Sequence, residues 1–133
     1  YINDSDAIMT LQPTSPFRSI IDFQKAIRLF NTENLNSIIS VSYDETLSLN
    51  ILYTKTKSNR CMPLDINHNK GMRRQDHGGL LVRNGSLYLT KVQHILEKKS
   101  LIHDETGFVH MNKTHSINID TYEDLEFARQ ITI

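Results

Sequence analysis

A carboxylate close to the C-terminus lies in a pattern that could hold a metal ion. Asn118, Ile119 and Asp120 directly precede Thr121, a residue type that commonly caps helices. Alternation along a strand would place Asn118 and Asp120 on the same face. A carboxylate between a strand end and a helix start can hold Mg²⁺ together with waters and phosphate oxygens. Asp124 is better explained as the acidic member of a Thr121-x-x-Asp124 capping box than as a ligand.

A second polar cluster, QPTSPFR at 12–18, follows the first apolar run. Its two prolines restrict the turn, and Gln12, Thr14 and Ser15 place hydrogen-bonding groups at the rim. Turn formation and helix capping explain most of this segment. They do not explain Gln12, an amide at the end of a strand that we expect to be buried, so we expect Gln12 to contact a ligand.

A third cluster carries guanidinium groups, which bind phosphate or carboxylate oxygens bidentately. It consists of Arg73, Arg74, Gln75 and Asp76, followed by Arg83 and the turn signal Asn84-Gly85. Taken alone, each half is more typical of a protein surface than of a site. The six histidines show no metal-ligand spacing, and the sequence suggests no activating partner for Cys61.

The elements that must position these clusters alternate between strands and helices. We predict strands at 7–11, 37–43, 47–51, 85–91, 108–112 and 116–120, and helices at 19–30, at 92–99 and from Thr121 onward. Ser19 and Asp22 form a pattern like a capping box at the start of the first helix. This alternation predicts an α/β domain with a mostly parallel sheet, in which ligands bind at the carboxyl ends of the strands. We expect strand 7–11 to be buried on both faces.

Composition and length exclude several classes of function. The 133 residues fit one domain, and we interpret the chain, which opens at Tyr1, as a piece of a longer protein. A net charge of zero argues against nucleic-acid binding. No apolar run reaches the roughly 18 residues of a membrane span. A single cysteine suits a reducing compartment, and we expect a cytoplasmic protein.

The stretch 55–79 is polar and lacks periodicity, with six Lys or Arg against two acids. Two interpretations stay open from its composition. It is a solvated loop, or it is an arm that moves over an anionic ligand or crosses to another subunit.

Four motifs in this order resemble the acylneuraminate cytidylyltransferase family, the CMP-sialic acid synthetases and their relatives. LQPTSPFR at 11–18 is similar to that family's LQPTSPLR. RRQD at 73–76, RNGSLYL at 83–89 and SINIDTYEDL at 116–125 are similar to its later landmarks RxQ, NGAxYI and SIDIDTxxDL. The resemblance covers essentially the whole chain, and four motifs in the right order are far more specific than one.

The resemblance implies a Rossmann-like nucleotidyltransferase domain, a homodimer with a small arm at about 44–83. It implies attack of the anomeric hydroxyl of a 2-keto-3-deoxy sugar acid on the α-phosphorus of CTP, which gives a CMP-sugar and pyrophosphate. Mg²⁺ and cationic side chains would neutralise charge in this step. By the matching motifs, Asp120 and Arg74 would be catalytic, and Asp120, with Asn118, would be the candidate Mg²⁺ ligands. The substrate-binding residues would be Gln12, Thr14, Ser15, Arg74, Gln75, Asn84 and Tyr88.

The chain departs from the family pattern in three places. The basic Gly/Ser/Lys phosphate-binding loop and its N-terminal strand–helix units are not among these residues, so we expect this chain alone to be inactive. Asn118 stands where the family has the first Asp of DID, which argues against a second metal site because an amide carries no charge. Val82 stands where many sialic acid enzymes have Arg, which leaves the partner of the sugar carboxylate open. Sialic, legionaminic and pseudaminic acids are comparable candidates for the sugar acid.

Two other functions remain open at this point. One is a truncated domain that binds a sugar acid or forms a dimer surface without turnover, which would explain both the absent loop and Asn118. The other is a related nucleotidyltransferase that acts on another sugar or base.

Overall fold

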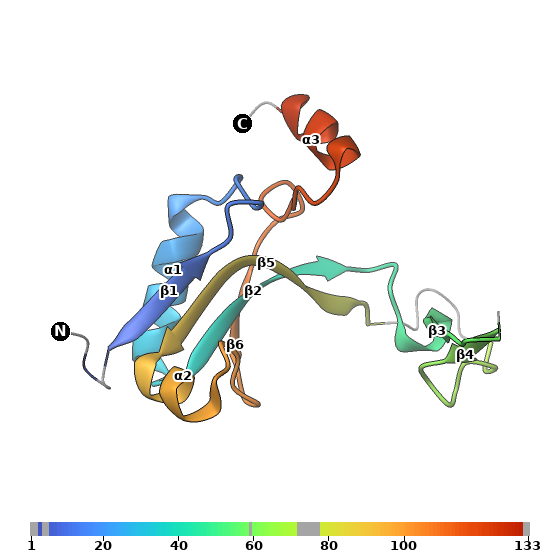
Figure 1. The fold of residues 1–133 in the computed structure, drawn as a ribbon, viewed down its shortest axis with the longest axis horizontal. Coiled ribbons are helices and arrows are strands. Elements are labelled where there is room, and N and C mark those ends of the chain that lie inside the picture. Colours follow the sequence, from blue (N-terminus) through green and yellow to red (C-terminus); the bar gives the residue numbers. More distant parts are fainter. Residues whose placement is uncertain (1–2, 4–5, 59, 72–77, 132–133) are drawn as a thin grey trace. The chain divides into compact units, whose positions relative to one another are not determined.

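The computed structural model describes residues 3, 6–58, 60–71 and 78–131. It divides the chain into two compact units (Figure 1). The first unit is formed by Tyr1–Ser42 with Arg83–Ile133, and the second is formed by Tyr43–Val82. In the described residues, no helix is long and apolar enough to cross a membrane.

A four-stranded sheet in the order β1-β5-β2-β6 organises the first unit within the described ranges. Its strands are β1 (Ala7–Leu11), β2 (Ser37–Asp44), β5 (Leu80–Lys91) and β6 (Gly107–His110). Strand β1 pairs antiparallel with β5, and β2 pairs parallel with β6. Hydrogen bonds from Lys91 to Asn36 and between Leu87 and Ser40 show that β2 and β5 also run in opposite directions.

The α/β class is confirmed, but the sheet is mixed and mostly antiparallel where we expected it to be mostly parallel. The physical reason is the connection between β2 and β5. No crossover helix joins them in the described residues, and the 43–82 unit that does join them brings the chain back antiparallel.

The expectation that strand 7–11 is buried on both faces is wrong. Strand β1 is an edge strand of the described sheet, and Ile8 and Leu11 are about 40% exposed. An apolar run without alternation is typical of a strand that is covered on both faces. Here the run forms an edge strand that pairs with β5 alone within the described sheet, and part of its apolar surface stays exposed.

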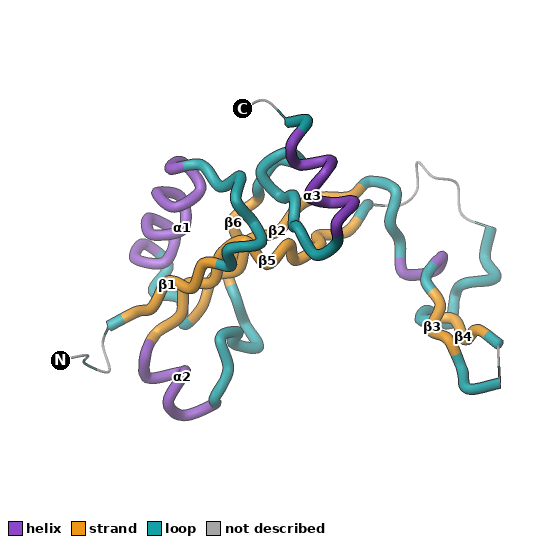
Figure 2. Tube along the Cα trace, turned by 45° about the horizontal axis from the view of Figure 1, so that its top comes forward, coloured by secondary structure: helices purple, strands orange, loops and turns teal. Residues whose placement is uncertain are grey.

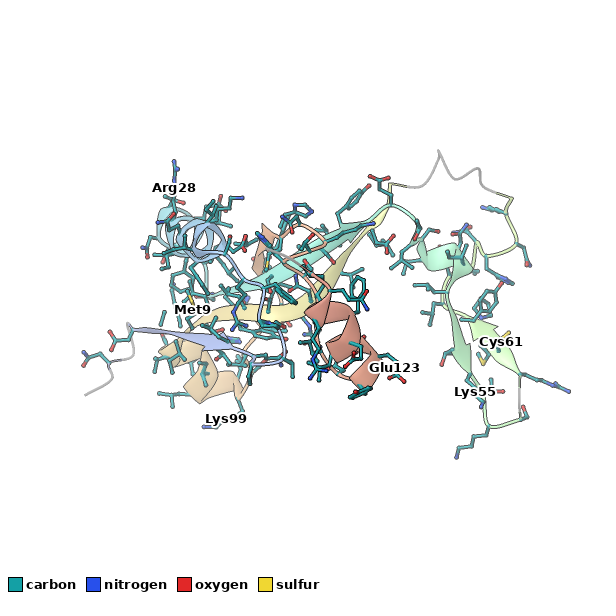
Figure 3. The ribbon with its side chains drawn as sticks, turned by 90° about the horizontal axis from the view of Figure 1, so that it is seen from above. Met9, Arg28, Lys55, Cys61, Lys99 and Glu123 are labelled. Atoms are coloured by element: carbon teal, nitrogen blue, oxygen red, sulfur yellow. The ribbon has the colours of Figure 1, made fainter. Side chains whose placement is uncertain are left out.

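Helix α1 (Ile20–Thr32) covers one face of the sheet, and α2 (Val92–Lys98) lies on the opposite side (Figures 2 and 3). The hydrophobic core lies between α1 and the strands. It contains Ala26, Ile38, Leu87, Leu89, Val109 and Met111, all at most 6% exposed. Met9 of β1 packs against this core and lies between β1 and α1 in Figure 3.

Both predicted capping boxes are present. Ser19 and Asp22 exchange side-chain and backbone hydrogen bonds at the start of α1. Thr121 and Asp124 do the same at α3 (Tyr122–Arg129). These boxes need four consecutive residues and no tertiary contact, which is why the sequence predicted them correctly.

The second unit holds a two-stranded sheet of β3 (Tyr53–Lys55) and β4 (Cys61–Pro63). The predicted strand at 47–51 is wrong, because Leu49–Ile51 forms a 3₁₀ helix. The polar stretch at 55–79 contributes Lys55 to β3 and all of β4, although it lacks a strand-like hydrophobic pattern. The predicted strand at 116–120 is also wrong, since that segment is a turn followed by irregular backbone.

Candidate functional site

Two segments far apart in the sequence meet beside the end of β1. The 12–18 turn leaves β1 at Leu11, and the 116–121 segment leads into α3. The Ile119 N–H donates to the Thr14 carbonyl at 2.8 Å, and the Ser15 hydroxyl donates to Asn118 Oδ1 at 3.2 Å. The sheet therefore brings the first and last predicted clusters together.

The Asn118 and Asp120 side chains are adjacent, as the predicted alternation implies. Asn118 Nδ2 donates to Asp120 Oδ2 at 2.6 Å, and Asp120 is exposed to solvent. The prediction holds although the segment is not a strand, because an extended backbone places residues i and i+2 on one side whether or not it is paired.

The Asp124 carboxylate belongs to the helix cap, as the sequence predicts. Its Oδ2 accepts from the N–H groups of Asp120 and Thr121, and the Thr121 side chain accepts from the Asp124 N–H. Hydrogen bonding to the Thr121 side chain, followed by these backbone bonds, lowers the pKa of Asp124 below its usual range.

Thr121→Ala should therefore raise the pKa of Asp124 toward its ordinary value and cost about 1 kcal/mol of helix stability. A lowered pKa stabilises the fold above the unfolded-state pKa of 3.8, and this contribution is lost as the pH falls through the folded-state pKa. The stability difference between wild type and variant should thus shrink from pH 7 to pH values below that range. An NMR titration of the Asp124 carboxyl measures the shift, and an unchanged pKa would contradict the assignment.

Gln12, Gly85 and Tyr88 lie together on the neighbouring part of the site. Gly85 has a φ of 72° inside β5, the left-handed conformation found at glycine bulges. A Cβ atom at Gly85 would lie 2.5 Å from Gln12 Oε1 and 3.8 Å from Tyr88 Oη. Gln12 is exposed and Tyr88 is buried, so the amide of Gln12 is available to a ligand beside a fixed phenol.

Gly85→Ala should displace the Gln12 side chain and lower the free energy of unfolding by about 1–2 kcal/mol, the cost of a left-handed residue with a Cβ. Chemical denaturation measures this loss. Gly78→Ala is the matched control, because a Cβ there meets no atom of the described residues within 4 Å. Equal stability of the two variants would show that the Gly85 conformation is not needed.

Asn84 occupies the centre of a hydrogen-bond network. Its Oδ1 accepts from the Ser40 hydroxyl at 2.6 Å and from the Ser86 N–H at 3.2 Å. Its Nδ2 donates to Ser116 Oγ at 2.9 Å and approaches Met111 Sδ at 3.6 Å. This set uses the full capacity of an amide. In this arrangement Asn84 shapes the site, and its expected contact with a sugar acid stays a prediction.

No family model matches the chain. Three curated proteins named N-acylneuraminate cytidylyltransferase, from Streptococcus agalactiae serotypes III, Ia and V, are each 29% identical to it over 122 residues. The chain is similar to the N-acylneuraminate cytidylyltransferases. The match covers 91% of this chain and confirms the resemblance carried by the motifs. The aligned part of the chain spans 29% of the length of these relatives.

Arg74 and Gln75, which the resemblance assigns to substrate binding, lie outside the described residues. Of the other predicted positions, Thr14 is exposed at the turn and Ser15 is fully buried. The Ser15 hydroxyl donates to Asn118, and its expected contact with a substrate stays a prediction.

The residues present fit a Mg²⁺ site with one protein carboxylate. Asp120 is exposed, whereas Asp124 is engaged in the cap. Among the described residues, no group of three or more His, Cys, Asp or Glu side chains could hold a metal. Mg²⁺ commonly binds through one or two carboxylates plus substrate phosphates, and it does not need a cage made of protein ligands alone. A single protein carboxylate is therefore compatible with a Mg²⁺ site.

Sequence reasoning missed two supports of the candidate site. Arg18 Nη1 donates to the carbonyls of Gln12 and Ser86 and thereby ties the 12–18 turn to β5. Ser40 binds both Asn84 and the backbone of Leu87. A serine inside the apolar strand 37–43 was an available signal, because a buried hydroxyl must find a partner.

Proposed function

We propose that this chain forms the sugar-acid side of a nucleotidyltransferase that activates a nonulosonic acid with CTP. The observation that carries the proposal is the contact between the 12–18 and 116–121 segments, two of the four family motifs, through Ser15 and Asn118. The similarity to proteins named N-acylneuraminate cytidylyltransferase supports it.

In the proposed reaction, the anomeric oxygen of the sugar acid forms a bond to the α-phosphorus of CTP while the bond to the pyrophosphate leaving group breaks. Gln12 and Tyr88 would orient the sugar by hydrogen bonds, and Arg74 would bind an anionic group. Asp120 would hold Mg²⁺, which would neutralise phosphate charge. Most of the rate enhancement would come from positioning the reactants and from charge neutralisation.

The proposal includes a Rossmann-like sheet in the intact protein. Strand β1 has a free edge within the described sheet, with apolar residues on both faces. Further strands that pair with this edge would bury it and carry the triphosphate-binding residues. The alignment covers only 29% of the length of the relatives, which agrees with a sheet that continues beyond the residues of this chain.

We also propose that the 43–82 unit is an arm that joins two subunits. Its two-stranded sheet is too small to be stable alone, and it exposes large apolar side chains, with Ile66 93% exposed. The change Ile66→Lys in the intact protein should convert a dimer to a monomer in sedimentation analysis. A mass unchanged by Ile66→Lys would place the interface elsewhere.

The reaction is tested by pyrophosphate release from CTP and Mg²⁺ with sialic, legionaminic and pseudaminic acids as separate substrates. The intact protein should turn over one of them, and CTP should be preferred to UTP and ATP. Binding of a sugar acid in calorimetry without turnover would support the non-catalytic domain. Turnover with a different nucleotide would favour the related nucleotidyltransferase.

A further inference from the structure

Three side chains form a continuous hydrogen-bonded row that runs from the interior to the surface. Ser15 is fully buried, Asn118 is partly buried, and Asp120 is exposed. The Ser15 hydroxyl donates to Asn118 Oδ1 at 3.2 Å, and Asn118 Nδ2 donates to Asp120 Oδ2 at 2.6 Å. The row therefore connects the turn after β1 to the exposed carboxylate.

The orientation of the Asn118 amide follows from its two neighbours. The Ser15 hydroxyl can donate or accept, so it suits either end of the amide. The ionised Asp120 carboxylate is an acceptor alone, so it requires the NH₂ end. The reverse orientation would bring the amide oxygen against the carboxylate, with repulsion in place of a charge-assisted hydrogen bond.

This orientation directs the oxygen of Asn118 away from Asp120 and toward Ser15. To ligate a cation held by Asp120, the amide would have to release Ser15 and turn over. The NH₂ group meanwhile fixes Oδ2 of the carboxylate and leaves Oδ1 unengaged by any hydrogen bond among the described residues. An aspartate at 118 could not donate in this way, because it would place two negative charges side by side.

We propose that Asn118 is a positioning residue, which holds one oxygen of Asp120 so that the other is presented to a single divalent cation. Asn118 then orients the Asp120 carboxylate, adds no charge and does not bind the cation itself. Ser15 holds the Asn118 amide in this orientation through its hydrogen bond to Oδ1 and is therefore a second positioning residue. The inference rests on the proposed function, because it requires that Asp120 binds the cation.

The test is calorimetric titration of the intact protein with Mn²⁺ alone. Asp120→Asn should abolish binding, and Glu123→Gln, at an exposed carboxylate of α3, should leave it unchanged (Figure 3). Asn118→Ala should weaken binding by about tenfold, within the range for loss of a hydrogen bond that orients a metal ligand. Ser15→Ala should weaken it in the same direction.

Ser15→Ala separates positioning from ligation. If Asn118 ligates, loss of Ser15 frees the amide oxygen, and Mn²⁺ binding stays the same or becomes tighter; that result overturns the inference. If Asp120→Asn binds Mn²⁺ as the wild type does, the proposed metal role of Asp120 fails instead. The two failures are therefore distinguishable.

Asn118→Asp gives an independent readout that does not depend on Ser15. Two adjacent carboxylates should lower the metal-free melting temperature, and Mn²⁺ should then raise it by more than it does in the wild type. An unchanged melting temperature with and without Mn²⁺ would show that position 118 does not act on Asp120.

Discussion

Asp120→Asn in the intact protein should reduce pyrophosphate release by about 10²–10⁴-fold, because a metal-bound charge contributes several kcal/mol to stabilisation of the transition state. Its free energy of unfolding should change by less than about 0.5 kcal/mol, as for other exposed substitutions. The Asp120 side chain is exposed, and an amide oxygen at 120 can still accept from Asn118 Nδ2. Steady-state kinetics and urea denaturation measure the two effects.

Glu123→Gln is the matched control for this prediction. It removes one carboxylate three residues away, on the exposed surface of α3, and should leave both activity and stability as they are. Extensive unfolding of Asp120→Asn would make Asp120 a structural residue. Full activity of Asp120→Asn in a folded protein would remove Asp120 from the proposed mechanism.

Asn84→Ala should lower the free energy of unfolding by roughly 2–4 kcal/mol, which is the cost of leaving buried polar groups without partners. The change deprives the Ser86 N–H of its acceptor and removes hydrogen bonds to the Ser40 and Ser116 hydroxyls. Urea unfolding of the intact protein measures the loss, and its midpoint should fall with an unchanged slope.

Asn36→Ala is the matched control for the Asn84 network. Asn36 is partly buried beside the same sheet, but its side chain makes no hydrogen bond to the described residues, and its backbone carbonyl accepts from Lys91. We expect a loss of less than about 1 kcal/mol there. If Asn84→Ala keeps full stability and raises the KM for the sugar acid alone, Asn84 is a substrate ligand and not the centre of a network.

Local signals predicted the parts of the fold that local interactions determine. Ser19 with Asp22, and Thr121 with Asp124, marked the starts of α1 and α3 because a capping box is complete within four residues. Strand direction was mispredicted because it depends on the path between strands. The 43–82 unit connects β2 to β5, and β5 runs antiparallel to β2. The residue types of the strands themselves do not indicate the path of this connection.

The candidate site shows the same division. Residue types and motif order were sufficient to single out Gln12, Asn84, Asn118 and Asp120, because few side chains can bind sugars, phosphates and Mg²⁺. Their working roles were not predictable. Asn84 is saturated by protein partners that lie up to 44 residues away in the sequence, and Arg18 joins two carbonyls that belong to different strands or turns.

The sequence by itself determined the helix caps, the α/β class, the cytidylyltransferase resemblance and the candidate residues, since each follows from short-range pattern or residue chemistry. The tertiary structure alone decided that Ser15, Asn118 and Asp120 form one row. Ser15 and Asn118 are 103 residues apart, and their hydrogen bond exists because the sheet brings the end of β1 beside the segment before α3. The orientation of the Asn118 amide then follows because Ser15 can donate a hydrogen bond to its oxygen, whereas Asp120 can only accept one from its NH₂ group.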